Sequence, residues 1–320
     1  KPGDISYLTS IAPPHIGVIT AIGSVHTELF GSVDKVMREK QQIISRLKKD
    51  DFAVLNTDDS LVIQTREKTR AQVVSFGFSE QAQVRATEVS ISTGHSPDPW
   101  IDQDIKGISF KLQYKGATVP VFLPSVLGTH QVYSALAAAV AGIAMDMNLA
   151  DISGALTEYQ SPPGRMRLLP GIKHTSIIDD SYNSSPMAAK AALQVLGDIT
   201  VSGKKFAALG DMLELVSYTD QGHREVGAAA AVTCDVLVTV GERAKLIAEG
   251  ARQAGMSEDS VFSFADTEPA GKFIQQRIKQ GDIILIKGSQ GARMEKVVKE
   301  LMAEPLRAAE LLVRQGTSWK

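Results

Sequence analysis

The sequence contains very little cysteine and few aromatic residues. Cys234 is the only cysteine among 320 residues, and Phe, Trp and Tyr together make up 6%. A single cysteine excludes an intramolecular disulfide and a thiolate zinc cluster, and it is typical of a chain made for a reducing compartment. We therefore expect a cytoplasmic protein.

The sequence also lacks a long apolar run and an excess of charge of one sign. Its most apolar stretch, residues 135–145, ends at Asp146 and is shorter than the ~18 to 20 residues that span a bilayer. Lys and Arg total 34 against 36 Asp and Glu, so the net charge of −2 gives no general attraction to nucleic acid or anionic lipid. We expect no membrane insertion and no nucleic-acid binding.

Several catalytic signatures are missing from the sequence. It contains no Gly-x-x-x-x-Gly-Lys-Ser/Thr phosphate loop, no Gly-x-Ser-x-Gly nucleophile elbow and no His-Glu-x-x-His zinc helix. The first residue is Lys1 rather than Met, and the residues after it do not read as a leader peptide. We therefore expect an upstream part of the protein to be missing from this chain.

Length and pattern predict two α/β domains. Short β-branched runs at residues 16–21, 52–55 and 73–76 alternate with an amphipathic helix that starts at Val33 and is capped by Ser32. A β-rich insertion at 84–123 and helices at 130–145 and 149–159 complete this part. The break at Ser161-Pro162-Pro163-Gly164 predicts domains at 1–162 and 163–320.

The second part alternates strand-like and helix-like segments. This alternation predicts a mostly parallel, doubly wound sheet whose ligand crevice lies beyond the carboxyl ends of the strands. The strand-like runs cover residues 176–178, 206–209, 236–240, 261–264 and 283–286.

Lys40 is the most informative single residue of the first part. It lies on the apolar stripe of its helix, where an ammonium group loses hydration and must be paired, neutralised or modified. Carbamylation by carbon dioxide would convert it into an anion able to bind magnesium, and His26 on the preceding loop could bind the same ion. The alternatives are a lysine that snorkels from the edge of the stripe and a structural histidine.

In the second part, candidate residues follow predicted strands. Arg165 offers a guanidinium to a phosphate, with a surface ion pair as the alternative. Asp179 and Asn183 follow a strand, where an acid accepts ribose hydroxyls, although Asn183 or Ser184 could simply cap a helix. Lys287 and Ser289 resemble an anion cradle, but such a turn is also common in ordinary loops.

The order and wording of these motifs resemble the Mur ligase family almost from end to end. Within that family, the resemblance is greatest to the members that join D-alanyl-D-alanine to UDP-N-acetylmuramoyl-tripeptide in peptidoglycan synthesis. The matching segments are Pro2 to Ile5, residues 26–32 (HTELFGS), Glu39-Lys40, 164–169 (GRMRLL), 178–183 (IDDSYN), 209–215 (LGDMLEL), 287–289 (KGS) and 294–296 (MEK).

The resemblance implies a central ATP- and magnesium-binding domain, truncated at its N-terminus, followed by a Rossmann-like domain that binds the dipeptide. It makes Lys40 a carbamylated lysine and His26 a magnesium ligand, and both would be catalytic together with Arg165, a phosphate contact. Asp179 becomes a ribose contact. The segment His130, Gln131 and Ser134 would read adenine, and Asn183, Lys287 and Ser289 would lie near the second substrate. We expect a monomer.

The sequence departs from the family pattern at several positions. Gln131 and Ser134 stand where the family has asparagines, Val216 where glycine is common, and Gln290 where a basic residue is frequent. The UDP-substrate domain and the phosphate loop are absent, so we do not expect these 320 residues alone to catalyse ligation. The alternatives are another amide ligase of the superfamily, of the folylpolyglutamate or cyanophycin synthetase type, and a non-catalytic nucleotide- or peptide-binding derivative.

Overall fold

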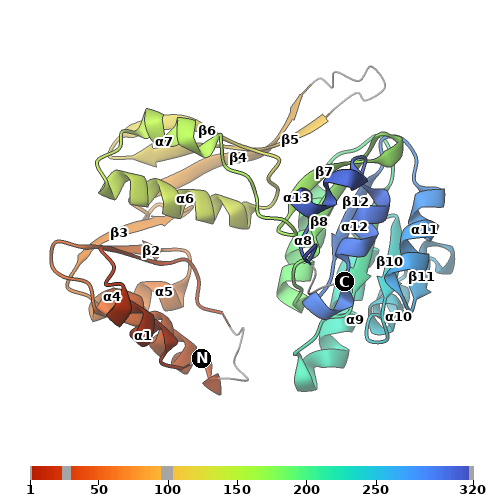
Figure 1. Cartoon of the computed structure of the whole chain (residues 1–320), viewed down its shortest axis with the longest axis horizontal. Helices are drawn as coiled ribbons and strands as arrows, with labels where there is room; N and C mark the ends of the chain where they lie inside the picture. Colours follow the sequence, from red (N-terminus) through yellow and green to blue (C-terminus); the bar gives the residue numbers. More distant parts are fainter. Residues whose placement is uncertain (1, 24–29, 95–103, 317–320) are drawn as a thin grey trace. The chain divides into compact units, whose positions relative to one another are not determined.

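A computed structural model describes residues 2–23, 30–94 and 104–316 (Figure 1). The chain divides into two compact units, each made of three separate segments of the sequence. The single domain boundary between residues 162 and 163 that we expected from the sequence stays a prediction. Unit 1 comprises Lys1–Ser90, Ser109–Leu123 and Thr129–Tyr159, and unit 2 comprises Ile91–Ile108, Pro124–Gly128 and Gln160–Lys320.

The first sheet has six strands in the order of the sequence, and β1 to β4 pair in parallel. The expected strands at the start of the chain and the β-rich segment after residue 84 are all present, with a turn at Lys115-Gly116 between the last two strands. The strands are β1 (Ile16–Ile19), β2 (Phe52–Asn56), β3 (Gln72–Gly77), β4 (Val84–Gly94), β5 (Asp104–Tyr114) and β6 (Ala117–Pro124).

The helices predicted for unit 1 are present in order, α1 and α5 were not predicted, and the apolar spacing from Val33 to Leu47 predicted a single helix. Ser32 caps α3 by accepting from the backbone N–H of Lys35, as predicted. The helix expected to continue to Leu47 is instead two helices, which meet at Gln41. The helical segments are α1 (Asp4–Ile11), α3 (Val33–Lys40), α4 (Gln42–Ser45), α5 (Ser60–Gln64), η1 (Thr65–Lys68), α6 (Thr129–Ala144) and α7 (Leu149–Leu156).

The sheet of unit 2 is doubly wound, as predicted, and has the order β11-β10-β9-β12-β8-β7. The five strands β8 to β12 pair in parallel, and β7 pairs antiparallel with β8 at one edge of the sheet. The sequence analysis missed β7, which contains Pro170 and therefore reads poorly as a strand except at an edge. The strands are β7 (Arg167–Gly171), β8 (Thr175–Asp180), β9 (Lys205–Gly210), β10 (Val236–Val240), β11 (Val261–Phe264) and β12 (Ile283–Lys287).

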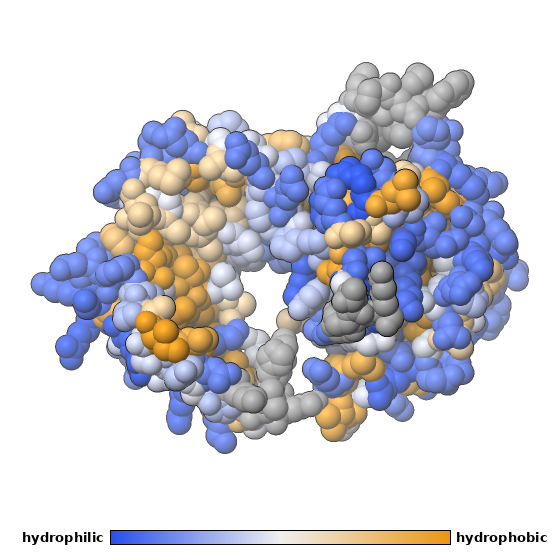
Figure 2. Space-filling model, viewed as in Figure 1, coloured by the Kyte–Doolittle hydropathy of each residue, from blue (hydrophilic) through white to orange (hydrophobic). Residues whose placement is uncertain are grey.

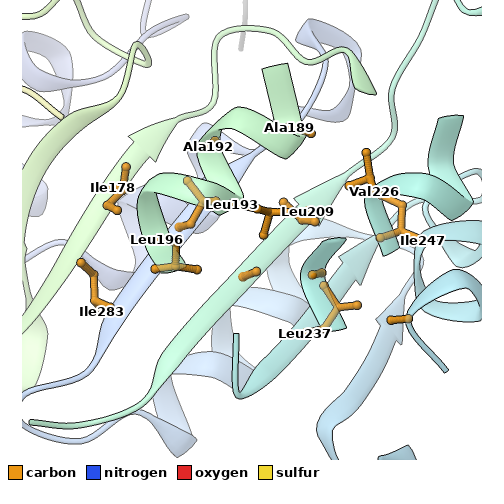
Figure 3. Close-up of a cluster of buried hydrophobic side chains, with 14 of the residues drawn as sticks. Ile178, Ala189, Ala192, Leu193, Leu196, Leu209, Val226, Leu237, Ile247 and Ile283 are labelled. Atoms are coloured by element: carbon orange, nitrogen blue, oxygen red, sulfur yellow. The ribbon is translucent and has the colours of Figure 1, made fainter. Parts of the chain in front are cut away.

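Alternate residues of these strands enter two separate cores, because side chains along a strand point to opposite faces. Leu237 and Ile283 pack with Leu193 of α8 on one face (Figure 3), whereas Val238 and Ile286 pack with Ile274 of α11 on the other. The helical segments are α8 (Pro186–Asp198), α9 (Thr219–Ala231), α10 (Lys245–Gln253), α11 (Thr267–Arg277), α12 (Glu295–Leu301) and α13 (Ala308–Leu311), with short turns η2 (Ile172–His174), η3 (Val216–Tyr218), η4 (Glu258–Ser260), η5 (Gln290–Ala292) and η6 (Pro305–Arg307).

The outer faces of the unit 2 helices are polar. Figure 2 shows mostly hydrophilic surface over α10 and α11, whose apolar residues face the sheet. This division is the one that a helix packed on a sheet requires. None of the helices in the described part of the chain has the length and apolar character of a membrane span.

Candidate functional site

Polar groups of unit 1 gather where its first three parallel strands end. The amide of Asn56, the last residue of β2, donates to the carbonyl of Thr20 after β1 at 2.9 Å. One carboxylate oxygen of Asp59 accepts from the N–H of Ile22 at 2.8 Å, and the other caps α5. These bonds hold the loops after β1 and β2 together at the carboxyl edge of the sheet.

Lys40 is the last residue of α3 and reaches this edge. Its Nζ donates to the carbonyl oxygen of Ala21 at 2.7 Å, and the side chain is half-buried. Burial lowers the pKa of Lys40, and the nearby negative charge of Asp59 opposes that shift only in part. The neutral amine, which is the form that reacts with carbon dioxide, is therefore more accessible than in an exposed lysine. His26 lies outside the described residues.

The three residues expected to read adenine lie on α6 but do not face the same way. His130 and Ser134 are exposed one turn apart, whereas Gln131 is buried and its Oε1 accepts from the Tyr159 hydroxyl at 3.3 Å. As placed here, the Gln131 carboxamide serves the fold of unit 1. Its predicted contact with adenine stays a prediction.

Tyr133, between these residues, connects α6 to the carboxyl edge. Its hydroxyl donates to Asp58 at 3.0 Å, and burial together with this carboxylate raises the pKa of Tyr133. Asp58 also accepts from the N–H groups of Phe78 and Ser79, so it joins the loops after β2 and β3. The sequence signal for Asp58 was its place in a polar loop directly after a buried strand.

Within the described ranges, no three His, Cys, Asp or Glu side chains form a cluster able to hold a metal ion.

In unit 2, two consecutive acids end β8. Asp179 is fully buried and accepts from the N–H groups of Gly164 and Ser181, both at 3.1 Å. Burial raises the pKa of Asp179 to about 6, and the adjacent charge of Asp180 acts in the same direction. Asp180 accepts from the N–H of Met166 at 3.2 Å. The two carboxylates thus hold the segment after the Pro-Gly break onto the end of the strand.

Lys287 and Ser289 complete this edge of unit 2. The register of β8 and β12 places Lys287 opposite Asp180, and the two side chains form a buried ion pair at 2.6 Å. Lys287 Nζ also donates to the backbone carbonyl of Asn183 at 2.9 Å. Ser289 Oγ donates to the carbonyl of Ser184 and accepts from the N–H of Leu213.

The structure therefore brings together the residues expected near the second substrate. Asn183 is exposed, and its side-chain oxygen accepts from the N–H of Ser184 at 2.9 Å. Neither Asn183 nor Ser184 caps the following helix, because that position is taken by Ser185. The helix-cap alternative for this segment was wrong.

Arg165 follows the Pro-Gly break and is exposed. Its guanidinium carbon lies 4.1 Å from the centre of the Tyr182 ring, a stacking distance for a cation on an aromatic face. Arg165 therefore lies against the loop that follows β8, and its predicted contact with a phosphate stays a prediction.

Two buried groups near this edge were assigned no role from the sequence. The carboxylate of Glu295 is buried and pairs with Arg293 at 2.6 Å and with Arg314 at 3.1 Å. His223 is buried too, accepts from the N–H of Met212 through Nε2 at 3.0 Å, and has its pKa lowered chiefly by burial. Glu295 stands in the matching segment 294–296 (MEK), but no local signal placed its carboxylate in the interior.

The loop after β9 contains a strained residue. Val216 has a φ of 47°, a left-handed conformation that β-branched residues rarely adopt. The sequence analysis noted Val216 as a departure from a pattern in which glycine is common there. The structure gives the physical reason, since glycine adopts this conformation without strain.

Comparisons with known proteins match each half of the chain to a domain family. Residues 1–142 match the Mur ligase middle domain, and residues 164–290 match the family described as "Mur ligase, glutamate ligase domain". The UDP-N-acetylmuramoyl-tripeptide--D-alanyl-D-alanine ligase of Bacillus subtilis is 31% identical over 95% of this chain and 63% of its own length. The Escherichia coli protein of the same name is 29% identical over 93% and 62%.

Solved structures agree with these matches. A crystal structure of MurF from Acinetobacter baumannii superposes with a TM-score of 0.78 at 29% identity, covering 92% of this chain and 62% of that chain. MurF ligase from Thermotoga maritima shares the fold, with a TM-score of 0.76 at 24% identity, covering 94% and 64%. The chain therefore spans less than two thirds of the length of these relatives.

Proposed function

Because the chain belongs to the Mur ligase family and contains its middle and C-terminal domains, we propose that the protein joins D-alanyl-D-alanine to UDP-N-acetylmuramoyl-tripeptide with consumption of ATP. The reaction belongs to peptidoglycan synthesis and takes place in the cytoplasm. The proposal is supported by end-to-end similarity to ligases of that name.

The geometric observation that carries the proposal is the state of Lys40. A half-buried amine with a lowered pKa, next to a carbonyl and close to Asp59, fits a lysine that is converted to a carbamate. Lys40 as a carbamate, and His26, would hold a magnesium ion, which supplies charge stabilisation to the phosphates of ATP. His130 and Ser134, exposed on α6, would contact the adenine ring, and the predicted contact of Gln131 stays part of the proposal.

The chemistry assigns distinct tasks to the residues of unit 2. The tripeptide carboxylate attacks the γ-phosphorus of ATP and releases ADP, and the amine of the dipeptide then displaces inorganic phosphate from the acyl phosphate. Negative charge grows on the phosphoryl oxygens in both steps, and the Arg165 guanidinium would stabilise it. Asp179 would contact the ribose. Asn183, Lys287 and Ser289 would bind the dipeptide.

The proposal is tested by phosphate release with ATP, magnesium, the UDP-linked tripeptide and a panel of acceptors. The protein as its gene encodes it should turn over with D-alanyl-D-alanine, whereas the 320-residue chain should not, because it has no phosphate loop. If the protein instead joins glutamate to a folate, or joins single L-amino acids, the assignment would move to another ligase of the superfamily. No turnover with any acceptor would favour a binding protein.

The role of Lys40 is tested separately. Lys40→Ala should lower turnover by at least about a thousandfold, and a small carboxylic acid in the buffer should restore part of it by replacing the carbamate. The matched control is Lys35→Ala, an exposed lysine on the same helix, which should remain active. Full activity of Lys40→Ala would contradict the carbamate role.

A further inference from the structure

The turn that carries Arg165 is hydrogen-bonded to the end of β8 and to the loop that follows it. The N–H of Tyr182 donates to the carbonyl of Gly164 at 3.1 Å, and the N–H of Gly164 donates to Asp179. Gly164 has a φ of 70°, and a Cβ at this position would lie 2.9 Å from the backbone nitrogen of Tyr182. The close approach therefore requires glycine, and it sets Arg165 directly over Tyr182.

The Tyr182 ring lies near two guanidinium groups. Arg165 is 4.1 Å and Arg314 is 5.5 Å from its centre. Arg314 also donates to the backbone carbonyls of Ser181 and Tyr182, and it pairs with Glu295. The side chains of Arg314 and Glu295 are 3% and 1% exposed, so this support is built into the interior of unit 2 rather than formed on its surface.

We propose that Tyr182 and Arg314 are positioning residues for Arg165, an inference that rests on the function proposed above. Arg314, fixed by Glu295, holds the backbone at residues 181–182, and the Tyr182 ring then holds the Arg165 guanidinium in one orientation. An exposed arginine otherwise samples many rotamers, and fixing it in advance removes an entropic penalty from the transition state. The same loop continues into Asn183, so the phosphate contact and the dipeptide site form one preorganised surface.

A double-mutant cycle in the protein as its gene encodes it tests whether Tyr182 acts through Arg165. We expect Tyr182→Leu to lower kcat about tenfold with KM for ATP changed less than about twofold, and Tyr182→Phe to retain wild-type kcat because the ring remains. In an Arg165→Ala background, Tyr182→Leu should have no further effect. Multiplied losses in the double variant would overturn the proposal.

Another stacked arginine provides a matched control. Arg277 lies 3.5 Å from the centre of the Phe273 ring on α11, which packs against the other face of the sheet. Phe273→Leu removes an aromatic partner in the same way, so it should leave kcat unchanged at a temperature where the variant is folded. A tenfold loss in this control as well would assign the effect of Tyr182→Leu to general destabilisation and overturn the proposal.

A measurement without turnover separates this inference from the proposed ligase activity. Nitrogen relaxation of the Arg165 Nε–H in the 320-residue chain should report a more rigid side chain than that of the exposed Arg66, and Tyr182→Leu or Arg314→Lys should loosen it while Tyr182→Phe does not. An equally mobile Arg165 in the unaltered chain would overturn the positioning role. Rigid Arg165 combined with absence of ligation would overturn the proposed function alone.

Discussion

Two lysines occupy comparable places in the two units and are held in opposite ways. Lys40 reaches the carboxyl edge of the first sheet, is half-buried, and donates to a backbone carbonyl. Lys287 ends a central strand of the second sheet, is 3% exposed, and pairs with the carboxylate of Asp180 at 2.6 Å. A direct carboxylate partner offsets the desolvation of a buried ammonium, whereas Lys40 donates to a neutral carbonyl and burial lowers its pKa.

The difference supports the proposal that Lys40, rather than Lys287, is converted to a carbamate. Lys40 has a lowered pKa and a place beside the polar loops after β1 and β2. Lys287 contributes its charge to a network that includes the backbone of Asn183. The proposed reactive group, Lys40, thus lies at the carboxyl edge of the first sheet. At the edge of the second sheet, Lys287 and Asp180 pair with each other and bond to the neighbouring loops.

The largest effect should come from breaking the buried pair in unit 2. Lys287→Met leaves Asp180 as a buried charge without its partner, so the free energy of unfolding should fall by about 3 to 5 kcal/mol. Chemical denaturation measures the change. Lys245→Met, which removes an exposed pair with Glu242, is the control and should change it by less than about 0.5 kcal/mol. A similar small change in Lys287→Met would contradict the contrast between the two edges.

The pH dependence of stability sharpens the same contrast. Asp179 has a folded pKa of about 6, above the ordinary unfolded value of about 3.9, so the folded state holds its proton longer. The stability of the wild type relative to Asp179→Asn should therefore be largest near pH 4, fall by on the order of 2 to 3 kcal/mol as the pH rises to about 6, and stay constant above pH 7. A difference that grows with pH would show that Asp179 is stabilised as a carboxylate.

The loop after β9 tests how firmly the second edge is held. Val216 is exposed and left-handed, so Val216→Gly should raise the free energy of unfolding by about 1 kcal/mol through relief of strain. Ser217→Gly, at the next residue with ordinary backbone geometry, should lower it because glycine gains more freedom in the unfolded chain. Thermal unfolding of the two variants measures both. Equal effects of the same sign would exclude strain at Val216.

The smallest effect is expected for the counterpart of the first variant. Lys40→Met removes a half-buried ammonium that donates to the backbone carbonyl of the exposed Ala21, so the free energy of unfolding should change by less than about 0.5 kcal/mol. Chemical denaturation of this variant beside Lys287→Met compares the two edges directly. A loss of several kcal/mol would mean that Lys40 is as firmly built into its unit as Lys287.

Much of the fold could be predicted from the sequence because buried strands leave a local signal. The runs at 236–240 and 261–264 are strands with the predicted bounds, and the amphipathic pattern from Val33 is a helix capped by Ser32. The edge strand β7 was missed because its pairing with β8, rather than its own composition, makes it a strand. The assignment of the described residues 91–94 and 104–108 to unit 2 likewise depends on contacts that no local pattern carries.

The candidate site divides in the same way. The residue types and their places after strands were readable, and their catalytic and binding roles stay predictions. The orientation of Gln131 toward Tyr159 was not readable, since a helix position alone does not say which neighbour a side chain meets. The burial of Glu295 was not readable for the same reason, because it depends on Arg314, which lies 19 residues further along the chain.

The sequence by itself determined most of the strands and helices and their order, because these depend on periodicity and on neighbours along the chain. Only the tertiary structure decided which groups surround the two lysines. Lys287 and Asp180 are 107 residues apart and meet through the register of β12 on β8, whereas Lys40 meets a carbonyl 19 residues away. The charge that a buried lysine carries depends on such long-range partners, and they exist only once the sheets have formed.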